Sequence, residues 1–114
     1  MSTKVPVPIR LIQLGGALGV AFWIVVIGRS VSEGTGNVLG VVFIGVILGA
    51  IHVVIAWGSE RRSKAVAYAI AFLFIGDLAL ALFVEPLAFV LVGATVVLAG
   101  LASLPTSRSW LFDA

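Results

Sequence analysis

The chain has 114 residues, of which 61% are hydrophobic and only 11% are charged, whereas soluble domains carry about 25% charged residues. A soluble chain this short could not bury so much apolar surface, so we expect a single membrane domain over residues 1–114, with the lipid bilayer as its solvent. The net charge of +2 comes from few, scattered basic residues, which excludes a nucleic-acid-binding stripe, and the absence of cysteine excludes disulfides and thiolate metal sites.

Continuous apolar runs divide the chain into predicted membrane spans. Each run is close to the roughly 20 residues that a helix needs to cross about 30 Å of hydrocarbon. Strands are disfavoured, because spanning strands alternate in polarity and at least about eight of them must close a barrel. The sequence therefore predicts an all-α, polytopic bundle of four transmembrane helices at about residues 9–27, 37–57, 65–84 and 86–104.

The breaks between these runs differ in length and character. Residues 28–36 are polar and glycine-rich, which is typical of a flexible loop, and residues 58–64 are short and charged. The third break is only Glu85-Pro86, and proline suits the first turn of a new helix. We expect the last two helices to form a close antiparallel hairpin. The alternative is one long helix kinked at Pro86, which would place Glu85 in lipid.

The basic residues predict the orientation of the spans. Arg29 alone falls on one side, and the other six fall on the opposite side: Lys4, Arg10, Arg61, Arg62, Lys64 and Arg108. By the positive-inside rule, both termini are then cytoplasmic and the protein lies in the cell membrane. Cleavage of the first run as a signal peptide near Ser30 would instead leave three spans. We expect the run to be retained, because its apolar stretch exceeds the usual length of about 7–15 residues.

Asp77 is a carboxylic acid inside the third apolar run, at a predicted depth of about 10 Å from the outer surface. A charged aspartate at the centre of a membrane helix costs roughly 2.5–3.5 kcal/mol, so this side chain should face protein or water, or be neutral. Three interpretations stay open. Asp77 hydrogen-bonds a neighbouring helix in its neutral form, pairs with Arg29, or binds a proton or cation in a transport path. The two structural interpretations are favoured.

His52 and Gln13 are the other predicted polar contacts inside the membrane. Both lie near the inner ends of their helices, and a hydrogen bond between them is plausible from their similar depth. A single histidine excludes a multi-histidine metal site, and we expect no metal and no cofactor, although one axial haem ligand, or two in a symmetric dimer, stays open. A proton relay between His52 and Asp77 is disfavoured, because their depths differ by roughly 10 Å.

Glycines at helical spacing predict where helix backbones approach one another. Small residues matter here because lipid provides no hydrophobic drive between helices. The stripes serve packing within the bundle or, in part, a subunit interface, and both interpretations stay open. The predicted packing positions are Gly15, Gly19, Gly45, Gly49 and Gly76.

The absence of a catalytic constellation in the sequence shapes the functional expectation. The single histidine and the buried acid lie at different depths, so no triad is expected to form, and we expect no enzyme activity. We expect a non-catalytic subunit or a self-associating bundle within a membrane complex, with copies of itself or larger membrane proteins as partners. The alternative is an oligomeric channel or a proton- or cation-coupled transporter that uses Asp77, for which a pore would need several chains.

Overall fold

A computed structural model describes residues 4–34 and 36–113 of the chain. Within these ranges all regular structure is helical, and four segments are long and apolar enough to cross a membrane. This confirms the predicted all-α class and the predicted number of candidate spans. The elements are α1 (Val7–Glu33), α2 (Val38–Glu60), α3 (Ala65–Phe83), the short 3-10 helix η1 (Pro86–Ala88), α4 (Phe89–Ser103) and α5 (Pro105–Phe112).

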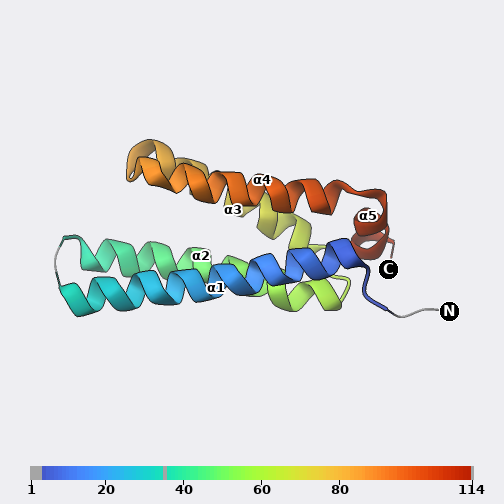
Figure 1. The fold of residues 1–114 in the computed structure, drawn as a ribbon, viewed down its shortest axis with the longest axis horizontal. Coiled ribbons are helices and arrows are strands. Elements are labelled where there is room, and N and C mark those ends of the chain that lie inside the picture. Colours follow the sequence, from blue (N-terminus) through green and yellow to red (C-terminus); the bar gives the residue numbers. More distant parts are fainter. Residues whose placement is uncertain (1–3, 35, 114) are drawn as a thin grey trace.

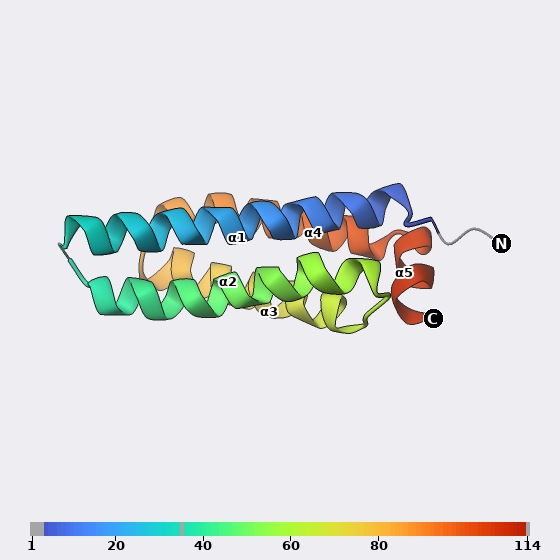
Figure 2. The same ribbon diagram turned by 90° about the horizontal axis from the view of Figure 1, so that it is seen from below.

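The long helices form an elongated bundle of two layers, with extents of 54 × 24 × 17 Å. Figure 1 shows α1 and α2 as one antiparallel layer and α3 and α4 as the other. Seen from below, α4 lies behind α1, and α3 lies behind α2 (Figure 2). The ends of the chain marked N and C lie at the same end of the bundle in both views. The α1–α2 pair makes the most extensive contact between helices, and α1 touches α4 much less.

Helix α1 runs further than the sequence predicted, because residues 28–33 are helical and not part of a loop. Two local interactions explain this extension. Arg29 and Glu33 form an ion pair one helical turn apart, with 3.3 Å between Nη2 and Oε1. Gly34 then ends the helix in the left-handed conformation (φ 65°), and its N–H donates to the carbonyl of Ser30. The turn to α2 is correspondingly short.

The break at Glu85-Pro86 separates two antiparallel helices, which rules out the alternative of one long kinked helix. Helix α3 ends at Phe83, and Glu85 has an extended backbone (φ −143°, ψ 106°). The Glu85 carboxylate accepts a hydrogen bond from the N–H of Leu87 at 3.2 Å, which caps the short helix η1. Pro86 occupies the first position of η1, where its missing N–H costs nothing.

The C-terminal helix α5 was not predicted from the sequence. It begins at Pro105 and crosses the end of the bundle at which the termini lie (Figure 1). Trp110 and Leu111 are buried against the rest of the chain, with 9% and 1% of their surface exposed. The docked helix therefore closes the apolar interior at this end.

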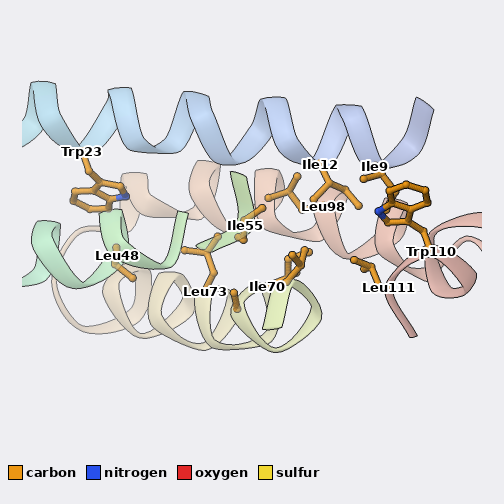
Figure 3. Packing of buried hydrophobic residues seen from close by; sticks show 12 residues of the cluster. Ile9, Ile12, Trp23, Leu48, Ile55, Ile70, Leu73, Leu98, Trp110 and Leu111 are labelled. Atoms are coloured by element: carbon orange, nitrogen blue, oxygen red, sulfur yellow. The ribbon is translucent and has the colours of Figure 1, made fainter. Parts of the chain in front are cut away.

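The buried side chains form a long, narrow core between the layers. Figure 3 shows Trp23 toward one end and Trp110 at the other, with aliphatic side chains such as Ile12, Ile55 and Leu98 between them. The core takes up a small part of each long helix. Only 17–28% of the most apolar stretch of 18 residues in each candidate span is buried inside the protein. Most apolar side chains thus face outward.

Candidate functional site

Asp77 lies on the inward face of α3 and is 2% exposed. Its neighbour across the hairpin is Thr95 of α4, which is also 2% exposed. The Thr95 hydroxyl oxygen lies 2.7 Å from Asp77 Oδ2 and 3.0 Å from the backbone carbonyl oxygen of Leu91. Asp77 Oδ1 is buried and has no hydrogen-bond partner among the described residues.

The two contacts of Thr95 are compatible with a neutral carboxylic acid at Asp77. A threonine hydroxyl has one hydrogen to donate, and a carboxylate and a backbone carbonyl both only accept. When Asp77 is a carboxylate, the Thr95 hydroxyl shares its one hydrogen between the two oxygens, whereas a protonated Oδ2 would donate to Thr95 and leave the Thr95 hydrogen for Leu91. A neutral acid also avoids an unpaired charge in a buried apolar setting, which is far more costly than a buried neutral group.

His52 lies on α2 with 9% of its surface exposed. Its Nδ1 atom lies 2.8 Å from the carbonyl oxygen of Leu48, one turn earlier in the same helix. Since a carbonyl only accepts, Nδ1 carries the hydrogen, and in the neutral ring Nε2 is an acceptor. The Cδ2–Nε2 edge of the ring lies against Gly19 of α1, where any side chain would overlap the imidazole.

His52, Asp77 and Thr95 line the same cavity, although they come from three different helices. The cavity has a volume of about 690 Å³ and lies between α1 and α4. Its other lining residues are almost all apolar, among them Leu18, Trp23 and Leu98. The sequence argument from helix depth disfavoured a proton relay between His52 and Asp77, and the structure places both at one cavity without a hydrogen bond between the two side chains in the part of the chain that it describes.

The structure does not bring Arg29 to Asp77. The Arg29 side chain is 77% exposed and pairs with Glu33 on its own helix. Such a pair keeps the guanidinium in contact with solvent, whereas reaching Asp77 would require its burial. The predicted contact between Gln13 and His52 is replaced as well, since Gln13 Nε2 donates to the carbonyl oxygen of Ala56 at 3.2 Å.

The predicted packing glycines each face a neighbouring helix or side chain. A Cβ at Gly15 would lie 2.6 Å from Leu98, and one at Gly76 would lie 3.0 Å from Leu48. A Cβ at Gly45 would lie within 3 Å of the Ile27 side chain. A Cβ at Gly49 would lie 3.6 Å from Cβ of Trp23, which is an ordinary van der Waals contact. The tightest contact with backbone, however, is at Gly16, where a Cβ would lie 2.7 Å from the backbone nitrogen of Ala56.

Two functional positions were missed by sequence reasoning. Thr95 contacts the carbonyl oxygen of Leu91 on its own helix, and its position opposite Asp77 follows from the hairpin register. Gly16 stands beside Gly15 in the sequence, and no signal shows which of the two faces α2. One signal for Thr95 was available in the sequence. In an antiparallel hairpin of the last two helices, Thr95 is a polar residue that can lie opposite the buried acid Asp77.

Asp77→Asn is expected to leave the free energy of unfolding within about 1 kcal/mol of wild type, because the amide N–H can replace the acid O–H as donor to Thr95. Thr95→Val, a variant of similar size, is expected to cost about 1–3 kcal/mol, because it leaves the buried acid without its partner. Denaturant titration of the detergent-solubilised protein measures both values. A loss in Asp77→Asn as large as that in Thr95→Val would indicate a charged carboxylate.

The described residues contain no group of three or more His, Cys, Asp or Glu side chains that could hold a metal ion. The chemistry available at the site is therefore that of a few hydrogen-bonding groups at an apolar cavity. Comparisons with known protein families, with curated protein sequences and with solved structures found no match for this chain.

Proposed function

We propose that the chain is an integral protein of the cell membrane and serves as a non-catalytic subunit that associates with its own copies or with larger membrane proteins. Support for insertion comes from the outward faces of the helices. Large apolar side chains such as Phe43 and Phe72 are each 66% exposed. A soluble protein buries most side chains of this kind, whereas a bilayer solvates them.

The proposed orientation places both termini in the cytoplasm. The chain ends lie at one end of the bundle together with α5 (Figure 2). Basic residues gather at this end, where Arg10 pairs with Glu60 at 2.8 Å and the guanidinium of Arg61 lies 4.1 Å from the ring centroid of Trp57. A tryptophan stacked with a cation suits the boundary between lipid and water, and an excess of basic residues favours the cytoplasmic side.

The observation that carries the proposed association is on α4. Gly93 and Gly100 lie two turns apart on this helix, and a Cβ at either position would meet nothing within 4 Å. Glycine in a helix costs about 1 kcal/mol relative to alanine, and packing within the chain does not require it at these positions. Val96, which is 53% exposed, lies between the two glycines on this helix. Such a surface suits the close approach of a helix from another chain.

A transport role for Asp77 has weaker support from the geometry. A conduction path needs polar groups or water along its length. The walls of the cavity at Asp77 are instead apolar side chains from α1 and α4, and its polar groups are confined to His52, Asp77 and Thr95.

Mass measurement of complexes purified in mild detergent tests the association. We expect wild type to appear as a multiple of 11.8 kDa or together with larger subunits. Gly93→Leu should reduce the associated fraction roughly tenfold, which corresponds to about 1.4 kcal/mol, because the leucine side chain prevents close helix contact. Ala71→Leu adds the same side chain at an exposed position of α3 and should leave the fraction unchanged.

Two outcomes would contradict this proposal. A wild-type protein that is monomeric and without companions at all concentrations would remove the association itself. An unchanged associated fraction in Gly93→Leu would show that α4 is not the contact surface.

A further inference from the structure

We infer that the cavity between α1 and α4 is a binding site for a neutral amphiphile, a molecule with one apolar chain and a hydroxyl head group. The head group donates its one hydrogen to Asp77 Oδ1, and the chain lies along the apolar walls. This goes beyond the proposed association, which concerns the outward face of α4.

The size and lining of the cavity suit such a ligand. Its volume of about 690 Å³ lies within the range of about 300–1,000 Å³ that is usual for small-molecule sites. Such sites are mostly apolar with a few polar groups that fix the orientation of the ligand. Here the polar groups are all deep in the cavity, because His52, Asp77 and Thr95 are each at least nine-tenths buried.

The cavity is accessible from the side of the bundle. Leu14 and Leu18 of α1 are 55% and 61% exposed, and Val97 of α4 is 62% exposed, yet all three line the cavity. Its opening therefore lies between two helices whose outer surface is apolar, and not at a polar end of the bundle. A molecule dissolved in lipid can enter this way, whereas a water-soluble ion would have to cross the apolar rim.

A second cavity extends the space available to an apolar chain. It has a volume of about 540 Å³ and lies toward the turn between α3 and α4, where it is lined by residues such as Val84 and Leu87. The two cavities share the lining residues Phe22, Trp23 and Leu91, so they are adjacent. A chain that begins beside Asp77 could continue into this space.

The polar atoms specify a hydrogen-bond donor. Asp77 Oδ1 is buried without a partner among the described residues, and in the neutral acid this oxygen is the carbonyl, which accepts. In the neutral ring of His52, Nε2 accepts as well, because Nδ1 already donates to Leu48. An unpaired buried acceptor costs about 1–3 kcal/mol, which a donating head group would recover.

A neutral Asp77 would select a hydroxyl over a cation. A cationic head group gains its main advantage from a carboxylate, whereas the protonated acid offers no such charge and completes the contacts of Thr95 with Asp77 and Leu91 without a shared hydrogen. A hydroxyl provides the required donor without bringing a charge into an apolar cavity.

Photolabelling of the protein in phosphatidylcholine nanodiscs tests this inference. The probe is cetyl alcohol that carries a photoactivatable diazirine on its chain, and labelled residues are located by mass spectrometry of peptides. We expect saturable labelling of α1 and α4 at residues that line the cavity. Unlabelled cetyl alcohol should compete, and its methyl ether, which has the same chain without the donor, should compete roughly two- to tenfold less well, as loss of one hydrogen bond predicts.

Two variants connect the labelling to Asp77. Asp77→Asn keeps an acceptor oxygen and should retain saturable labelling. Asp77→Leu removes the acceptor and should lower the affinity by a similar two- to tenfold, while the stability of each variant is checked by the unfolding titration. If Asp77→Leu does not fold, the comparison of the alcohol with its methyl ether in wild type still shows whether the hydroxyl donor contributes to binding.

Three results would overturn the inference. Labelling that does not saturate, or that falls outside α1 and α4, would show that the cavity does not bind the alcohol. Equal competition by the alcohol and the ether would show apolar filling without head-group recognition. Stronger competition by cetyltrimethylammonium, a cation without an N–H donor, would show that a charged carboxylate binds the ligand. None of these results bears on the mass of the complex, so the proposed association is tested separately.

Discussion

Gly16→Ala is expected to lower the free energy of unfolding by about 1–3 kcal/mol, as overpacking of a close helix contact does. The added Cβ would lie 2.7 Å from the backbone nitrogen of Ala56 and 3.0 Å from the backbone oxygen of His52. Backbone atoms cannot turn away as a side chain can, so α1 and α2 would have to separate. This is the most extensive helix contact of the fold, so the loss extends beyond the substituted residue.

Gly28→Ala is the matched control for this prediction, because it makes the same change in the same helix. A Cβ at Gly28 would meet nothing within 4 Å, so this variant should be unchanged or more stable by up to about 1 kcal/mol, the difference in helix propensity. Denaturant titration followed by circular dichroism measures both variants. Equal stability of Gly16→Ala and Gly28→Ala would show that the helices are not in the close contact described.

Trp110→Ala is expected to cost about 3–5 kcal/mol, the usual range for removing a buried tryptophan. Trp110 fixes α5 to the bundle through several contacts. Its Nε1–H donates to the carbonyl oxygen of Ser59 at 2.7 Å, and the Arg62 guanidinium lies 4.5 Å from its ring centroid. Arg62 Nε also donates to the Trp110 carbonyl oxygen at 3.1 Å. Without the ring, α5 should detach from the turn between α2 and α3.

Two further variants separate the contributions of packing and hydrogen bonding at Trp110. Trp110→Phe keeps an aromatic ring and loses the N–H donor, so the free energy of unfolding is expected to fall by about 1 kcal/mol. Trp57→Ala removes a tryptophan that is 64% exposed and stacks with the Arg61 guanidinium, and it should cost no more than about 1 kcal/mol. Hydrogen exchange of the α5 amides reports detachment directly. Unchanged protection of α5 in Trp110→Ala would contradict the proposed docking.

Much of the architecture could be predicted because membrane-length apolar runs and breaker residues are visible in one dimension. The hairpin at Pro86 is an example, since proline and a neighbouring acid mark a helix start wherever they lie. Helix α5 gave no such signal. It has eight residues of mixed polarity, and its stability comes from the Trp110 contacts with residues some 50 positions away.

The surroundings of Asp77 could be predicted only in outline. Its burial and its hydrogen bond to a neighbouring helix were among the alternatives, because an acid in an apolar run has few other ways to avoid contact with lipid. Its partner depends on the rotation of α4 about its own axis, which decides whether Thr95 or a neighbour faces α3. The Arg29 alternative failed for a local reason, since Glu33 lies one turn away on the same helix and is reached without burial.

The most direct test of the four-span account is labelling of single cysteines in intact cells with a membrane-impermeant maleimide. The chain has no cysteine of its own, so Ser32→Cys at the end of α1 and Ser109→Cys in α5 each provide one exposed thiol at opposite ends of the bundle. The account predicts labelling of Ser32→Cys in intact cells and of Ser109→Cys only after permeabilisation. Labelling of Ser109→Cys in intact cells, or protection of Ser32→Cys until permeabilisation, would contradict it.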